Sequence, residues 1–175
     1  MIRKNPQNCP PLDFDQWLPP LEKMQLWGGR IAEIAHISNV PTLRVLTLAG
    51  HKHLQLLTGN NSGPTWMLFQ DCKKLDVRSI GTFEDVEHLT ITGIKTGGSL
   101  SSFSALSKLQ TLSLLQCRMI PETVDLKEHA PLLKKIMISD SPESILRSVS
   151  MKNKNVIAAN GKIAYVDGIA CSDIV

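Results

Sequence analysis

The chain has 175 residues, of which 42% are hydrophobic and 20% charged, and its formal net charge is +3 at pH 7. This length corresponds to one domain, and the composition is that of an ordinary globular protein. The charge is small and the Lys and Arg residues are dispersed, which argues against a nucleic-acid partner. No stretch approaches the roughly 18 apolar residues that span a bilayer.

Residues 1–20 are rich in proline, asparagine and aspartate and contain Phe14 and Trp17. We expect them to form an N-terminal cap, because the first unit of a repetitive fold otherwise leaves apolar core open to water. No apolar segment follows the basic residues Arg3 and Lys4, so this segment does not resemble a secretory signal. We therefore expect a cytoplasmic protein with reduced thiols. The four cysteines are Cys9, Cys72, Cys117 and Cys171.

An L-x-x-L-x-L pattern recurs through the following residues. Its middle apolar residue is successively Met24, Leu46, Met67, Leu89, Leu112 and Ile136, at intervals of 22, 21, 22, 23 and 24 residues. A fixed period in this range indicates stacked structural repeats. The last two apolar positions of each copy alternate as in a β-strand, so Leu46 and Leu48 are expected to face a core and Thr47 the opposite side.

The third copy, Pro64-Met67-Phe69, is the weakest. A register shift of one residue would exchange Met67 with Trp66 or Leu68 between the core and the outer face.

The segments between the strands have different spacings. In residues 31–43 apolar residues recur every three positions, which favours 3₁₀ turns or short helical turns over a second strand. Residues 54–66 are rich in Gly, Asn and Pro and predict an irregular loop. Residues 121–135 predict a helix with Pro121 in its first turn, and residues 162–168 predict a final strand or a closing ribbon.

The ninth position of the pattern carries a further signal, because leucine-rich repeats prefer Asn or Cys there. This position holds Cys72 in the third copy and Cys117 in the fifth, whereas the other copies carry Gly29, His51, Ile94 and Ser141. The chain thus resembles a small, divergent, single-domain member of the leucine-rich-repeat superfamily.

This resemblance implies an α/β fold in the form of a short right-handed solenoid. About six repeats would place a parallel β-sheet on the concave face and 3₁₀ or short helical segments on the convex side. The chain would divide into an N-terminal cap (1–20), the repeats (21–160) and a C-terminal cap or closing strand (161–175).

The sequence shows no set of residues typical of an active site. His51 and His53 could offer two nitrogens to a metal ion if both lay on one strand face. No third ligand is evident near them, so a solvated loop is the favoured interpretation. No nucleophile elbow or phosphate-binding glycine loop is present in the sequence. We expect a protein that is not an enzyme and that holds no metal ion or cofactor.

The outward strand positions carry aromatic, leucine and methionine side chains among small residues. This composition is typical of a protein-contact surface. The residues expected to bind a partner are Trp27, Val45, Trp66, Leu68, Gln70, Asp71, His88, Thr90, Leu115 and Met137. In the alternative interpretation Trp27 packs on the N-terminal cap and Trp66 fills space in the irregular third repeat.

Leucine-rich repeats generally act through their concave sheet or its rims. The resemblance therefore implies a non-catalytic module that binds another protein, with inhibition, as by an immunity-type protein, as one mode of action. The alternative is a structural or adaptor subunit of a larger assembly, such as a ribonucleoprotein or a ligase complex. We expect a monomer or a heterodimer with the partner protein, without nucleic acid or membrane.

Overall fold

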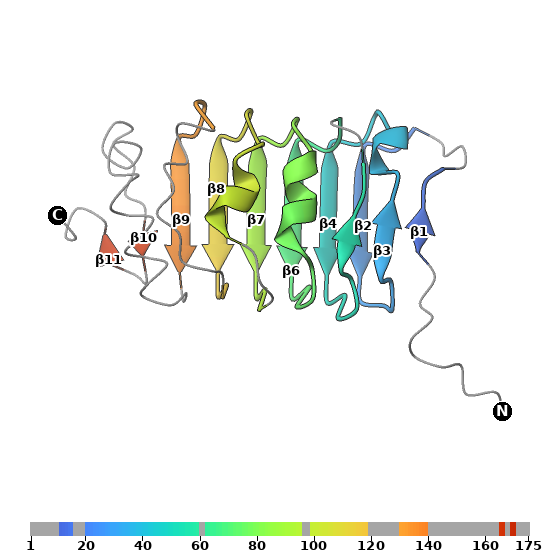
Figure 1. The fold of residues 1–175 in the computed structure, drawn as a ribbon, viewed down its shortest axis with the longest axis horizontal. Helices are drawn as coiled ribbons and strands as arrows, with labels where there is room; N and C mark the ends of the chain where they lie inside the picture. Colours follow the sequence, from blue (N-terminus) through green and yellow to red (C-terminus); the bar gives the residue numbers. More distant parts are fainter. Residues whose placement is uncertain are drawn as a thin grey trace.

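The computed structural model describes residues 11–15, 20–59, 62–95, 99–118 and 130–139, and two short strands near the C-terminus. Six parallel five-residue strands lie side by side in one sheet (Figure 1). They are β2 (Lys23–Trp27), β4 (Val45–Ala49), β6 (Trp66–Gln70), β7 (His88–Thr92), β8 (Thr111–Leu115) and β9 (Lys135–Ser139). The described return segments run along the other side between strands, and the chain forms a parallel-strand β-solenoid of about five turns.

Neighbouring strands of this main sheet pair without any slip in register. Leu46 lies opposite both Met24 and Met67, and Met67 in turn lies opposite Leu89. Met67 and Phe69 are fully buried. The third repeat therefore has the predicted register despite its weak pattern, because the neighbouring strands fix its pairing as well as its own residues do.

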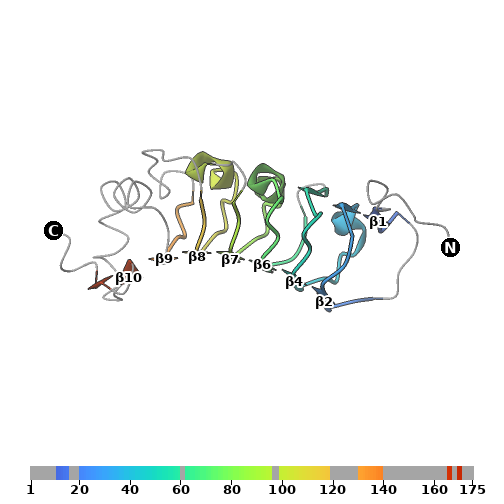
Figure 2. The same ribbon diagram turned by 90° about the horizontal axis from the view of Figure 1, so that it is seen from below.

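On the opposite side of the solenoid, the described residues form a second, smaller sheet and three 3₁₀ helices (Figure 2). The sheet is parallel and consists of β1 (Leu12–Asp13), β3 (Glu33–Ala35) and β5 (Leu56–Leu57). The helices are η1 (Ile37–Asn39), η2 (Val77–Thr82) and η3 (Leu100–Phe103). Within the described ranges the helical content is limited to these 3₁₀ turns, so the α component of the expected α/β class is small.

Two sequence predictions for this side were correct only in part. The 3₁₀ turn favoured for residues 31–43 is present as η1, but the strand β3 precedes it, and residues 54–66 contain the short strand β5 within the predicted loop. The reason is pairing with neighbouring coils: Ile34 lies opposite Leu12 on one side and Leu57 on the other. These partners are remote in sequence, and they satisfy backbone groups that would otherwise be buried without hydrogen bonds.

Two other predictions concern the C-terminal part. Most of the helix predicted for residues 121–135, namely residues 121–129, lies outside the described residues. Residues 130–134 form a turn that leads into β9. Of the final strand or closing ribbon predicted over 162–168, the structure describes residues 165–166, and the other residues lie outside the described part. β10 (Tyr165–Val166) pairs in parallel with β9 and antiparallel with β11 (Ile169–Ala170).

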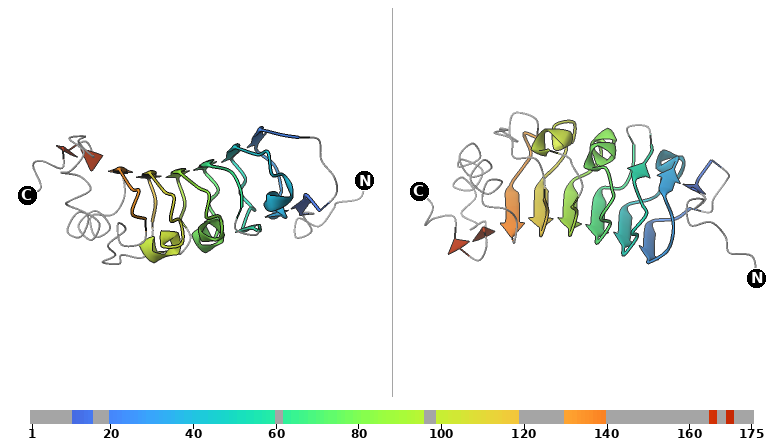
Figure 3. Two further views of the ribbon diagram at one scale, coloured as in Figure 1. Left: turned by 90° about the horizontal axis from the view of Figure 1, so that it is seen from above. Right: turned by 60° about the horizontal axis from the view of Figure 1, so that its bottom comes forward.

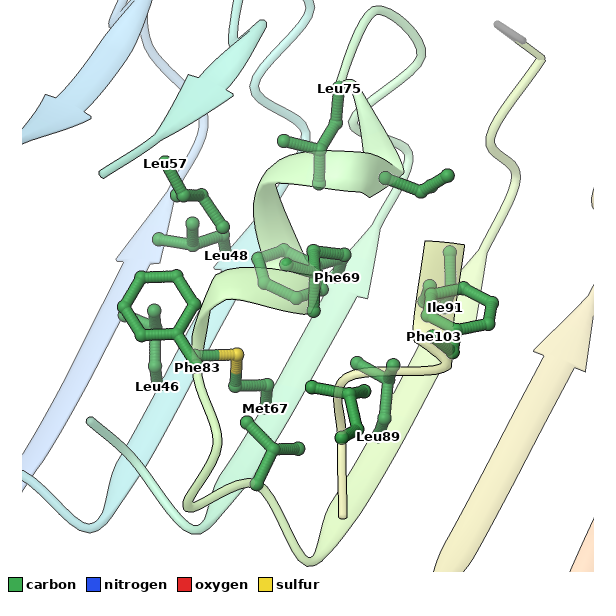
Figure 4. Close-up of a cluster of buried hydrophobic side chains, with 14 of the residues drawn as sticks. Leu46, Leu48, Leu57, Met67, Phe69, Leu75, Phe83, Leu89, Ile91 and Phe103 are labelled. Atoms are coloured by element: carbon green, nitrogen blue, oxygen red, sulfur yellow. The ribbon is translucent and has the colours of Figure 1, made fainter. Parts of the chain in front are cut away.

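A single hydrophobic core lies between the main sheet and the return segments. Each of the first five long strands buries its second residue, and the return segments contribute Phe83 and Phe103 from the turns at η2 and η3 (Figure 4). Because each coil contacts only its neighbours, the stability of such a fold depends on the interfaces between coils.

The ninth position of the repeat lies inside the turn that follows each strand. The Cys72 thiol donates to the carbonyl oxygen of Leu48 (3.6 Å) and the Cys117 thiol to that of Ile91 (3.4 Å), in each case on the preceding strand. His51 occupies the same position, and its Nε2 lies 3.1 Å from the carbonyl oxygen of Leu26.

The interpretation of His51 as part of a solvated loop was therefore wrong, because its ring is buried. A glycine before it and a lysine after it suggest an exposed turn. The position within the repeat determines instead that the side chain points inward and bonds the backbone of the previous coil.

An ion pair fastens the N-terminal strand β1 to the next coil. His36 Nδ1 lies 2.6 Å from Asp13 Oδ1. The hydrogen bond to Asp13 raises the pKa of His36 above its ordinary value, and the hydrogen bond to His36 lowers the pKa of Asp13. Both side chains are exposed to solvent, so the pair contributes little to global stability.

We expect this pair to fasten β1 only within a pH window. Its contribution is lost as the pH rises through the raised pKa of His36, and also as the pH falls through the lowered pKa of Asp13. NMR titration of the His36 ring should show a raised pKa that falls back toward the ordinary value in Asp13→Asn. An unchanged His36 titration in that variant would contradict the assignment; Asp15→Asn is the control, since Asp15 acts on His36 only through its charge.

Candidate functional site

The candidate site lies on the side of the main sheet that faces away from the core, here called the open face. The first, third and fifth residues of each long strand point to it. The views in Figure 3 show that the 3₁₀ helices all lie on the other side of this sheet. The open face is thus uncovered by the described return segments.

The first outward row of the open face, at the amino ends of the strands, contains Trp66 on β6. The register places it between Val45 and His88, and its ring centroid lies 5.2 Å from that of His88 with the planes tilted by 43°. Trp66 is 50% exposed, whereas Val45 and His88 are half-buried. One half of the indole therefore packs on its neighbours and the other half remains available for contact.

A second row of the open face lies two residues further along the strands. Leu68 is half-buried and lies between Thr47 and Thr90. Thr47 and Ser113 point outward but are almost completely shielded by the larger side chains around them. The alternation of the sequence predicted their direction correctly but could not predict their burial, because the shielding residues come from other strands.

The carboxyl ends of the strands form the edge of the open face. Gln70, the last residue of β6, is exposed, and Asp71 follows it with a positive φ of 54°. The same left-handed conformation occurs at the equivalent position of the other turns. These residues are Gly28, Gly50, Gly93 and Gln116, with φ of 64°, 70°, 73° and 54°.

The structure thus brings together part of the predicted site and separates the rest. Val45, Trp66, Leu68, His88 and Thr90 form one contiguous area, with Gln70 and Asp71 at its edge. Trp27 lies at the far end of β2, two strands from β6, and Leu115 and Met137 lie on β8 and β9.

The alternative interpretations of the two tryptophans fare differently. Trp27 is 69% exposed, and most of the N-terminal segment on which it would pack lies outside the described residues. Trp66 does not fill the core of the third repeat, because Met67 and Phe69 occupy that position.

The titratable groups of the described residues include two buried thiols. Burial raises the pKa of the Cys72 thiol to about 11 and also raises the pKa of Cys117, so both thiols are protonated and poorly nucleophilic at neutral pH. In the described ranges no three His, Cys, Asp or Glu side chains gather closely enough to hold a metal ion. What the open face offers is an aromatic and aliphatic surface with scattered polar groups.

None of the helices within the described residues has the length and apolar character needed to cross a bilayer. Comparison of the chain with models of protein families, with curated proteins and with solved structures finds no match.

Proposed function

We propose that the chain is a divergent leucine-rich-repeat protein whose open face is the concave surface of the solenoid and binds another protein. The observation that carries this proposal is Trp66, half-exposed at the amino end of β6, between Val45 and His88 on the neighbouring strands. Large aromatic residues at the centre of an interface dominate binding energies when they enter a pocket on the partner. Here Val45 and Leu68 supply the apolar surround, and His88, Gln70 and Asp71 supply hydrogen-bonding groups.

The pairing of the strands also favours this area of the open face as the binding site. The contact residues stand on three paired strands, β4, β6 and β7, so their positions are fixed before a partner arrives. A preorganised surface loses little conformational entropy on binding. Inhibition of the bound protein is the mode we favour, since a rigid surface of this kind can cover an active site without any chemistry of its own.

Trp66→Ala should weaken binding to the partner by about 30-fold or more, the effect expected of a central aromatic contact. The partner is first identified by affinity purification from the native cell with mass spectrometry, and the affinity is then measured by calorimetry. Folding should be retained, because half of the side chain is solvent-exposed.

The matched control is Leu56→Ala, which removes an exposed apolar side chain (39% exposed) from the opposite sheet. Its affinity for the partner should remain unchanged. Adding Asp71→Asn to Trp66→Ala should weaken binding further without strain, since asparagine tolerates the positive φ of this position. Equal losses in the Trp66 and Leu56 variants would show that the open face is not the binding site.

A further inference from the structure

A positively charged residue follows each of the first five long strands at the same separation in sequence. It stands three residues after the last residue of the strand, and in each turn it is exposed to solvent. These residues are Arg30, Lys52, Lys73, Lys95 and Arg118. They are one repeat apart in sequence, which is why they are dispersed along the chain, but their positions in the fold are equivalent.

The solenoid gathers these cations along one edge, here called the basic edge. Because the strands are parallel and in register, all the turns that follow them lie at the same edge of the sheet (Figure 1). Each turn also begins with a residue of positive φ, so the turns start with the same backbone conformation. With strands about 4.8 Å apart, five equivalent positions form a row about 19 Å long.

The charge of the basic edge is largely uncompensated. Among the described residues none of the five cations forms an ion pair, whereas Arg78 pairs with Asp76 (2.7 Å) and Lys108 with Asp85 (2.5 Å) elsewhere. Asp71 is the one carboxylate in these described turns.

The opposite edge of the sheet has a different balance of charge. Two carboxylates, Glu22 and Glu87, lie immediately before β2 and β7. They are interspersed with four cations at or just before the strand starts: Lys23, Arg44, Lys134 and Lys135. The spacing along the basic edge is shorter than the Debye length of about 8 Å at physiological ionic strength, so its charges act together on a ligand.

We propose that the basic edge binds the phosphate backbone of a single-stranded nucleic acid. A regular row of cations fits a polymer whose charges repeat regularly, which is true of any nucleic acid and of few protein segments. A stacked strand places a phosphate about every 3.4 Å along its axis, so a row about 19 Å long faces about five or six phosphates. Arg30 and Arg118 at the two ends can each hold a phosphate with two hydrogen bonds.

Trp27 favours a single strand over a duplex. It ends β2, three residues before Arg30, and its indole is 69% exposed at the same edge. Unpaired bases stack on exposed aromatic rings, whereas a duplex keeps its bases inside. Gly28 and Gly29 lie between Trp27 and Arg30 and present no side chain to obstruct a strand.

The binding is tested with the full chain and a fluorescein-labelled 12-nucleotide oligouridylate, by fluorescence anisotropy at several NaCl concentrations. About five phosphate contacts should give a slope of about −3.5 in a plot of log K against log salt concentration. Lys52→Gln combined with Lys73→Gln should reduce the slope to about −2 and weaken binding about 25-fold at 0.1 M salt.

The matched control is Arg44→Gln with Lys134→Gln, which removes two exposed cations from the opposite edge and should change neither slope nor affinity. Trp27→Ala should weaken binding about fivefold or more while leaving the slope unchanged, because it removes stacking and no charge. Circular dichroism checks that each variant is folded.

Competition experiments test whether the basic edge prefers a single-stranded nucleic acid to other polyanions. Duplex RNA, polyglutamate and phosphatidylserine vesicles should each compete more weakly than unlabelled oligouridylate. The proposal is overturned if no salt-dependent binding occurs, if the control pair loses as much affinity as the Lys52 and Lys73 pair, or if one of these competitors binds more tightly than the single strand. Failure here leaves the open-face proposal intact, because the Trp66 test uses a different partner and different residues.

Discussion

Phe83→Ala is expected to lower the free energy of unfolding by about 3–5 kcal/mol, the usual cost of removing a buried aromatic ring. Phe83 follows η2 and is fully buried in the core (Figure 4). Its ring lies against the backbone of the preceding return segment at Gly59 and Gly63, where an added β carbon would run into it. Urea denaturation followed by circular dichroism measures the loss, with Phe83→Leu as the milder comparison.

The contact between Phe83 and Gly63 gives this prediction a specific check. A β carbon at Gly63 would come within 2.7 Å of Phe83 Cδ1, so Gly63→Ala should destabilise the wild-type chain. In the Phe83→Leu background the same substitution should cost less, because the ring edge that it meets is gone. Strict additivity of the two changes would show that the ring does not pack against this glycine.

Gly81→Ala is the second substitution with a large expected effect. Gly81 lies in η2 and is buried, and a β carbon there would collide with the backbone carbonyl oxygen of Ser102 in η3. A carbonyl group cannot rotate away as a side chain can, so one 3₁₀ turn must shift relative to its neighbour. We expect a loss of about 1–3 kcal/mol or more in the free energy of unfolding.

Gly28→Ala is the control for this collision. A β carbon at Gly28 would meet no neighbouring atom within 4 Å, and only its positive φ of 64° opposes the substitution. The expected cost is about 1 kcal/mol, typical of a left-handed position without steric conflict. Thermal unfolding of both variants checks the difference, and equal melting temperatures would show that η2 and η3 are not in close backbone contact.

The strands of the main sheet could be predicted because their signal is local. Leu46 and Leu48 alternate with Thr47, and the interval of about 22 residues repeats this unit. The period of two assigns each residue to a face whatever the surrounding fold. For the same reason the weak third repeat was assigned correctly, with Met67 inside and Trp66 outside.

The return side was predicted less well because its structure depends on neighbouring coils. Glu33–Ala35 forms β3 because segments about one repeat away, β1 and β5, offer backbone partners on both sides. His51 was placed in solvent because its neighbours in the chain are polar or glycine. A comparison of residues by their position in the repeat would have predicted that the His51 side chain points inward, since His51 aligns with Cys72 and Cys117.

Alternation and spacing along the chain were enough to predict the period of the main-sheet strands and the face to which most of their residues point, although they left the register of the weak third repeat open. Which outward residues remain exposed depends on the packing of neighbouring strands, since Thr47 and Trp66 point the same way but Thr47 is 7% exposed and Trp66 50%. The tertiary structure also decided that cations dispersed along the chain form one row. Stacking converts a separation of a whole repeat into about 4.8 Å, and the physical neighbours of a residue in a solenoid are its counterparts in adjacent coils.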